Sequence, residues 1–147
     1  MRQERTGAAI AELETALDND RCNREVAVNL ARINRQIDNL DRTRAVYLAM
    51  LDCDPHDAQA MYNLGSLELE SGSAAYAEAW FERAVATDGR YAAGHYGLAL
   101  VRLREGNTEQ AARSLRECLA VAEGDDTISH RAAMLLSDIE GREKRED

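Results

Sequence analysis

The feature that most constrains the fold of this chain is a repeat with a period of 34 residues. Similar triplets recur at that spacing, as Asn29-Leu30-Ala31, Asn63-Leu64-Gly65 and Gly97-Leu98-Ala99. The same register holds for large apolar residues (Tyr47, Phe81, Leu115) and for turn-forming pairs (Asp38-Asn39, Gly72-Ser73, Gly106-Asn107). A period of this length is typical of arrays in which each repeat packs only against its neighbours. We therefore expect three repeats, at residues 24–57, 58–91 and 92–125.

The residues within each repeat predict two helices. In the second repeat, apolar residues fall at helical spacing, first at Ala60 and Leu64 and then at Ala77, Phe81 and Ala84. Asp57, just after the only proline, is a good N-cap for the helix that follows, and Asn107 is a good N-cap within the third repeat. No segment alternates apolar and polar residues for long enough to predict a strand. The sequence therefore predicts an all-α protein.

When the three repeats are aligned, the columns of equivalent residues resemble the tetratricopeptide repeat (TPR) family, whose 34-residue unit is a helix–turn–helix. Leu64-Gly65 fits the small residue at the contact between the two helices of a unit, and Ala77, Phe81 and Ala84 fit the small–aromatic–small pattern of the second helix. The resemblance implies a right-handed α-solenoid of three TPR units. One column departs from the family, which usually has a large aromatic residue there: it holds Asn34, Glu68 and Arg102.

The two ends extend the pattern and predict one flanking helix at each end, giving eight helices in all. Residues 1–23 are expected to form a short tail and an orphan helix at about 8–19, which matches the second helix of a unit without its first. The chain is then either excised from a longer array or capped naturally by this helix. Residues 126–147 are expected to form a capping helix from Thr127 to Gly141, followed by a frayed tail.

Composition excludes several classes of function. Asp and Glu number 27 against 18 Lys and Arg, giving a net charge of −9, which disfavours a nucleic-acid binder. No apolar run is long enough to span a membrane, and the N-terminus lacks the apolar region of a secretory signal. Cys22, Cys53 and Cys118 are far apart and suggest neither a disulfide framework nor a zinc site. We therefore expect reduced thiols and a cytoplasmic location.

The sequence offers no signature of catalysis. The single lysine, Lys144, lies near the C-terminus, which excludes a P-loop and a kinase lysine, and no metalloprotease or nucleophile-elbow motif is present. His56, His95 and His130 lie on different segments, and His95 shares the apolar column of Met61. We predict a packed core histidine at position 95, and no catalytic, cofactor or metal site.

The resemblance implies that the first helices of the repeats line a concave wall that holds an extended or helical peptide segment of another protein. The wall residues expected to contact this partner are Asn29, Arg32, Arg35, Tyr62, Asn63, Tyr96 and Arg104. Amides can bond a peptide backbone, tyrosine rings bury area at low entropic cost, and the arginines favour an acidic or carboxylate group. The alternative is that both tyrosines pack repeats together and the arginines are ordinary solvated charges.

The leading functional hypothesis is a non-catalytic scaffold. One alternative is a small acidic TPR secretion chaperone, and another is a regulatory or oligomerising segment of a larger protein, self-associating through exposed terminal helices. Family members that hold the acidic tail of heat-shock chaperones use a clamp of Lys, Asn and Arg. The clamp positions fall on Val28, Arg32, Asn63, Ala93 and Gly97, of which only Asn63 matches. The chain therefore does not resemble such an adaptor.

Overall fold

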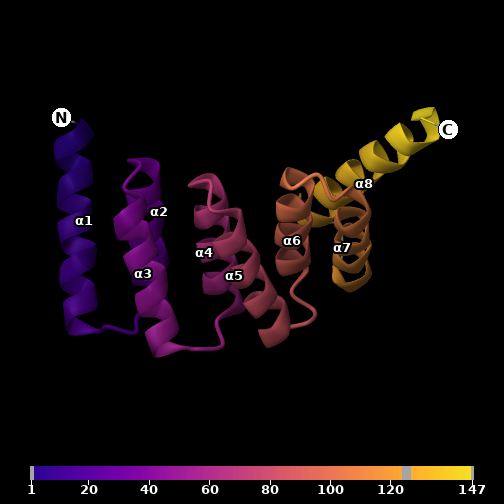
Figure 1. Cartoon of the computed structure of the whole chain (residues 1–147). Helices are drawn as coiled ribbons and strands as arrows, with labels where there is room; N and C mark the ends of the chain where they lie inside the picture. The colour runs from indigo at the N-terminus through magenta and orange to yellow at the C-terminus, as the bar shows by residue number, and fades with distance from the viewer. Residues whose placement is uncertain (1, 124–126, 147) are drawn as a thin grey trace. The chain divides into compact units, whose positions relative to one another are not determined.

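The computed structural model describes residues 2–123 and 127–146. Within these ranges the chain forms eight α-helices and no strand, as predicted (Figure 1). They are α1 (Arg2–Asn19), α2 (Arg24–Gln36), α3 (Leu40–Cys53), α4 (Ala58–Glu70), α5 (Ala74–Thr87), α6 (Ala92–Arg104), α7 (Thr108–Val121) and α8 (Thr127–Glu146). The contacts divide the chain into an N-terminal unit, Met1–Ala60, and a C-terminal unit, Met61–Asp147. The division falls inside α4.

Both terminal helices are longer than the sequence predicted. α1 begins at Arg2 rather than near residue 8, and α8 continues past Gly141 to Glu146. The extra turns consist mostly of charged and polar residues with good helix propensity, which the apolar periodicity could not reveal. The predicted boundary between the third repeat and the C-terminal helix, at 125 and 126, lies outside the described residues.

The turn inside each predicted repeat is set by one residue with a positive φ. Asp38, Gly72 and Gly106 have φ of 60°, 87° and 79°, and they are spaced by the 34-residue period. In each turn the backbone N–H of the next residue donates back to a carbonyl five positions earlier, for example from Asn107 to Arg102 at 2.8 Å. This is the pattern of a Schellman helix end, for which glycine has the lowest backbone cost. Asp38 adopts the same conformation with a side chain.

Asparagine and aspartate side chains fix where several helices begin. The side chain of Asp57 accepts a hydrogen bond from the Ala60 backbone N–H at 2.9 Å, which confirms it as an N-cap. Asn107 caps α7 in the same way through the Gln110 N–H at 3.4 Å. Equivalent caps lie at Asn23 and Asn39. These local signals explain why the starts of α4 and α7 were predicted correctly.

The core of the C-terminal unit is organised around Phe81 on α5. Its ring is fully buried between Gly65 of α4 and Gly97 of α6. A Cβ at position 65 would lie 2.6 Å from Phe81 Cε1, and a Cβ at position 97 would lie 2.5 Å from Cδ1. No real side chain tolerates such distances, so the two glycines let both helices approach the ring. The contact positions α4 and α6, which carry candidate binding residues.

A Gly97→Ala variant should test this close approach. We expect net destabilisation of about 1–2 kcal/mol, because overpacking against Phe81 outweighs the higher helix propensity of alanine. Urea unfolding followed by circular dichroism measures the change. Gly7→Ala is the matched control, since nothing lies within 4 Å of a Cβ there. Equal effects of the two substitutions would contradict the packing described.

Candidate functional site

The candidate residues of the N-terminal unit lie along α2. Arg32 is exposed and donates through Nη2 to Oδ1 of Asn29 at 3.0 Å. This bond holds the Asn29 amide in one orientation, so that its N–H groups can donate to a ligand carbonyl. Arg35 lies one helical turn further and is half-buried. The structure therefore brings these three predicted residues together on one helix.

In the C-terminal unit, Tyr62 is a half-buried ring held by other aromatic side chains. Its centroid lies 5.6 Å from that of Phe81 and 6.1 Å from that of Tyr91, the second pair in an edge-on arrangement. Such geometry is favourable for aromatic pairs and restricts the ring. Asn63 is also half-buried. Tyr62 and Asn63 therefore combine a fixed ring and an amide at neighbouring positions of α4.

Tyr96 differs from Tyr62, because it is only 3% exposed. Its ring packs in the core cluster that contains Ala99 and Leu115, and Arg131 of α8 lies 5.4 Å from the ring centroid. Tyr96 is therefore a packing residue, in agreement with the alternative to partner binding that the sequence left open for it. A partner could contact this ring only after α6 or α8 moved.

Arg104 lies at the C-terminal end of α6 and reaches the end of α4. Its Nη1 donates to the backbone carbonyl of Leu69, one of the acceptors that a helix end leaves without an intrahelical partner. The half-buried side chains Leu100 and Leu103 lie on the same helix. Arg104 therefore has a structural role in addition to the binding role predicted for it.

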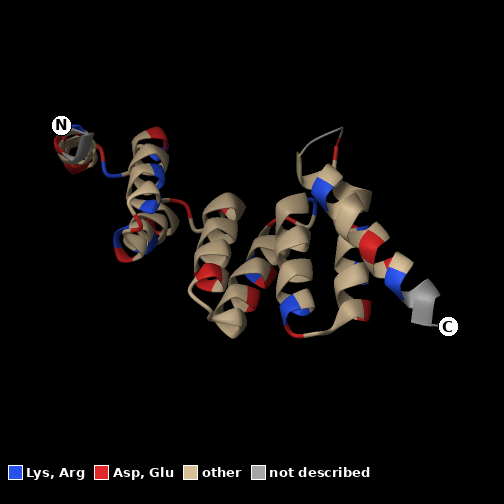
Figure 2. Cartoon of the chain, turned by 90° about the horizontal axis from the view of Figure 1, so that it is seen from above, with Lys and Arg blue, Asp and Glu red and all other residues tan. Residues whose placement is uncertain are grey.

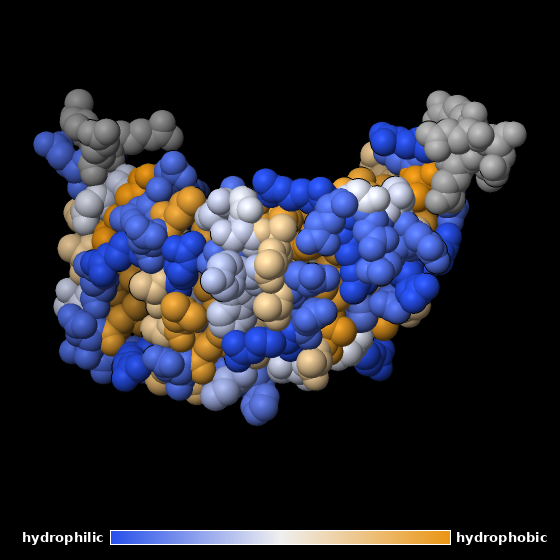
Figure 3. All heavy atoms as spheres, in the orientation of Figure 1, coloured by the Kyte–Doolittle hydropathy of each residue, from blue (hydrophilic) through white to orange (hydrophobic). Residues whose placement is uncertain are grey.

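The predicted binding helices of the C-terminal unit carry few charges. In α4 and α6 the charged side chains lie only in the last turns, at Glu68 and Glu70 and at Arg102 and Arg104 (Figure 2). By contrast, α7 mixes acidic and basic residues along its length. On the face drawn in Figure 3, hydrophobic residues are scattered among hydrophilic ones. The acidity of the chain is thus not concentrated on α4 and α6.

His95 is buried, as predicted, and its Nε2 lies 3.0 Å from the carbonyl oxygen of Gly89. In residues 2–123 and 127–146, no group of three or more His, Cys, Asp or Glu side chains is placed to hold a metal ion. Among the helices described, none is long and apolar enough to cross a membrane.

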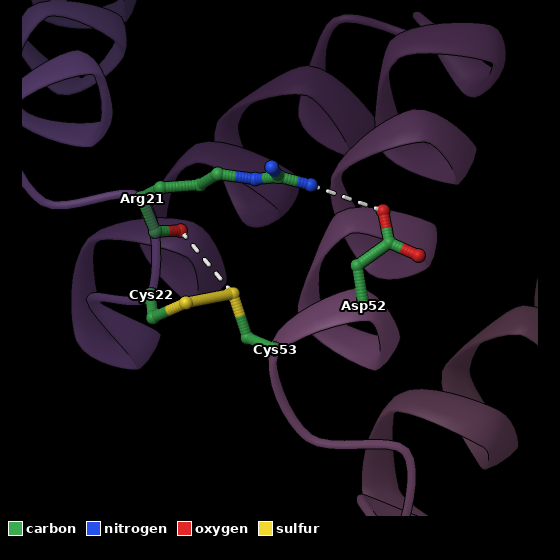
Figure 4. The surroundings of a disulfide bond; sticks show 4 residues. All are labelled: Arg21, Cys22, Asp52 and Cys53. Atoms are coloured by element: carbon green, nitrogen blue, oxygen red, sulfur yellow. Dashed lines mark hydrogen bonds and ion pairs between the residues drawn. A yellow bond between two sulfur atoms is a disulfide. The ribbon is translucent and has the colours of Figure 1, made fainter.

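The expectation of three reduced cysteines is wrong, because Cys22 and Cys53 form a disulfide (Figure 4). Cys22 lies in the loop before α2 and Cys53 ends α3, so both lie at the same end of this helix pair, with Cα atoms 5.6 Å apart. That geometry suits a disulfide. The two cysteines are 31 residues apart, so no short motif indicated that they pair. The predicted pair of helices nevertheless placed both of them at the same end. Cys118 is buried as a small core residue and is not part of a disulfide.

Ion pairs reinforce the disulfide end of the N-terminal unit. Arg21 Nη2 lies 3.2 Å from Asp52 Oδ2, directly beside the disulfide (Figure 4). Arg24 Nε lies 3.2 Å from Oδ2 of Asp57, whose side chain is buried and also caps α4. The exposed Arg21 pair contributes at most about 1 kcal/mol, so the covalent bond is the main constraint on the loop.

The family follows from comparison with known proteins. A tetratricopeptide repeat model matches residues 1–58 and 44–93, well over half of the chain. The chain therefore belongs to the TPR family, and its fold class is the all-α TPR solenoid that the sequence predicted. No curated protein sequence matches it significantly.

Solved structures with the same fold share little sequence with this chain. A crystal structure of MamA is 19% identical with a TM-score of 0.70, covering 99% of this chain and 92% of MamA. The type III secretion chaperone SycD of Yersinia enterocolitica, solved with a peptide of the translocator YopD, is 18% identical with a TM-score of 0.72. That match covers 81% of this chain and 93% of SycD. The first TPR domain of Spaghetti (RPAP3), bound to an HSP90 peptide, is 20% identical with a TM-score of 0.68, covering 80% and 90%.

Removal of the disulfide should destabilise the N-terminal unit. The chain-entropy estimate for a closed loop of this length is about 3–4 kcal/mol, which we expect as an upper limit for Cys22→Ser with Cys53→Ser. Hydrogen exchange in α1 and in residues 20–23 measures the loss of protection. A reducing agent should reproduce it in the wild type and have no effect on the double variant. Unchanged exchange on reduction would mean that noncovalent contacts alone hold the loop.

Proposed function

We propose that this protein is a non-catalytic scaffold that binds a peptide segment of a partner protein through the first helices of its repeats. The observation that carries the proposal is the arrangement on α4, where a fixed and partly exposed Tyr62 ring lies beside the Asn63 amide. Rings of this kind are enriched among residues that dominate binding energy, because they bury a large area with few rotatable bonds. The adjacent amide can pair with a peptide backbone.

The surface of α2 suggests what part of a ligand binds to the N-terminal unit. Arg32 is exposed, and its contact with Asn29 leaves several guanidinium donors directed to solvent. An acidic side chain or a C-terminal carboxylate is the group that such an arginine binds best. On α4 and α6, Leu69, Leu100 and Leu103 favour an apolar part of the ligand. We therefore propose a segment with distinct acidic and hydrophobic parts.

Proteins with this fold support the proposal. SycD has been solved with a YopD peptide, PcrH with the chaperone-binding region of PopD, and RPAP3 with an HSP90 peptide. At these identities the likeness concerns the fold alone. It supports peptide binding as the kind of function, and the residues of this chain carry the more specific proposal.

A TPR secretion chaperone is the second candidate. This chain spans 93% of SycD and 92% of PcrH, so the likeness in fold extends over nearly the whole of both chaperones. A chaperone of this class would bind an unfolded export substrate, whereas a scaffold would bind a segment of a folded partner. A secretion operon beside the gene would favour the chaperone.

A selection from a random peptide library tests the binding surface. We expect enriched peptides that combine acidic and hydrophobic residues, and Tyr62→Ala with Arg32→Ala should weaken their binding by about 2 kcal/mol or more. Isothermal titration calorimetry on the folded variants measures this loss, because both side chains are partly exposed and neither substitution removes a core residue.

The matched control makes the same two changes on second helices, as Tyr76→Ala with Arg113→Ala. Tyr76 is 70% exposed on α5, and Arg113 is an exposed residue of α7. The control should bind like the wild type. Loss of affinity in the control alone would move the site to the second helices and contradict the proposal.

The disulfide bears on where the protein works. Disulfides persist in oxidising compartments and are rare in the cytosol, so we propose an oxidising location rather than the cytoplasmic one expected from the sequence. Acid quenching of native cells, followed by alkylation and mass spectrometry, would measure the state of Cys22 and Cys53. We expect both to be protected from alkylation. Quantitative alkylation of both would instead favour the cytoplasm.

A further inference from the structure

The N-terminal unit contains a cavity of about 450 Å³ between α1, α2 and α3. Ala27 and Leu30 of α2 and Val46 and Met50 of α3 line it, and all four are buried. Leu17 contributes the α1 side. Protein interiors are close-packed, and an apolar void of roughly 150 Å³ already suffices to bind benzene. A cavity of this volume, with apolar side chains from three helices in its wall, therefore has room for a small molecule.

One buried polar side chain lines the same cavity. Asn34 is only 2% exposed, and its Nδ2 donates to the Leu30 carbonyl at 2.9 Å. Among the described residues, no donor is bonded to its Oδ1. The Oδ1 atom of Asn34 can accept a hydrogen bond, so the cavity wall offers one acceptor to whatever fills it.

The charged residues around the cavity are largely satisfied already. The three arginines of the lining each have a carboxylate partner: Arg21 pairs with Asp52, Arg24 with Asp57 and Arg42 with Glu14. An anionic ligand would have to break one of these pairs or enter an apolar space unpaired, which is costly. An uncharged ligand avoids both penalties.

The length of the cavity restricts the ligand further. The lining residues of α2 run from Arg24 to Asn34, which at 1.5 Å per residue is about 15 Å. Arg24 lies near the disulfide end of the unit, since Cys22 and Cys53 are also lining residues, and Asn34 lies near the other end of α2. A molecule extended along α2 can therefore contact the whole of this lining.

We propose that this cavity binds an elongated, uncharged, mainly apolar small molecule whose terminal hydroxyl or amide donates to Oδ1 of Asn34. The apolar chain lies against Ala27, Leu30 and Met50 and extends toward the disulfide. This site is separate from the peptide-binding surface proposed above and does not depend on it.

Three simple probes test the chemistry of the site on the full, oxidised chain. 1-Octanol carries the donor, heptyl methyl ether is its isomer without a donor, and octanoate is charged at neutral pH. By isothermal titration calorimetry we expect saturable binding of 1-octanol, at least tenfold weaker binding of the ether, and no measurable binding of octanoate. Equal affinities, or no saturable binding of 1-octanol, would overturn the proposal.

Two variants locate the binding. Asn34→Leu keeps a similar shape but removes the acceptor, so the affinity for 1-octanol should fall to that for the ether, which should be unchanged. Ala27→Leu places extra carbon atoms in the cavity and should abolish binding of both. Ala86→Leu, the same change at an exposed position of α5, is the control and should bind like the wild type. Unaltered 1-octanol binding in Ala27→Leu would place the ligand elsewhere and reject the site.

A cavity that holds only water, or that is closed by α1, would give different results. If the cavity is simply filled by water or closed by movement of α1, Ala27→Leu raises the melting temperature while no probe shifts that of the wild type, and the proposal fails. If Asn34→Leu does not fold, as judged by circular dichroism, the ranking of the three probes on the wild type and the Ala27→Leu result still decide.

Discussion

The contact on which the C-terminal unit depends is the Phe81 ring between two glycines. Because Gly65 and Gly97 have no side chains, α4 and α6 both approach α5 closely enough to bury the ring completely. The same ring supports Tyr62, at a centroid distance of 5.6 Å. A residue that packs the core thus also orients the side chain that we propose for binding. Small residues at positions 65 and 97 are therefore needed both for stability and for the proposed recognition.

The sequence predicted those elements whose signals are local. The turns at Asp38, Gly72 and Gly106 and the caps at Asp57 and Asn107 depend on residues within a few positions of each other, and they were found correctly. The burial of Tyr96 was left open, because it depends on α8 lying against α6, which no local pattern reveals. For the same reason the disulfide was missed, although its two cysteines occupy the same end of a predicted helix pair.

The N-terminal unit is held together differently from the C-terminal unit. The α1 residues in the apolar register, Ala9, Leu13, Ala16 and Leu17, are all only half-buried, whereas Ala77, Phe81 and Ala84 of α5 are completely buried. Leu13 stands in the column of Phe81 and fills less space, and Asn34 stands where the family usually has a large aromatic residue. Of these two positions, Asn34 lines the cavity, and the disulfide adds a covalent constraint at the end where Cys22 and Cys53 line it.

The helix α2 links the two sites proposed for the N-terminal unit. Its Ala27, Leu30 and Asn34 line the cavity, while Asn29 and Arg32 form the polar cluster proposed for binding. A ligand in the cavity would give α2 packing contacts that α1 alone supplies incompletely, and it would donate to Oδ1 of Asn34. A better packed α2 holds the Asn29–Arg32 pair in one geometry, which lowers the entropic cost of binding a partner. An occupied cavity would then favour peptide binding, and by thermodynamic reciprocity a bound peptide would favour occupancy of the cavity.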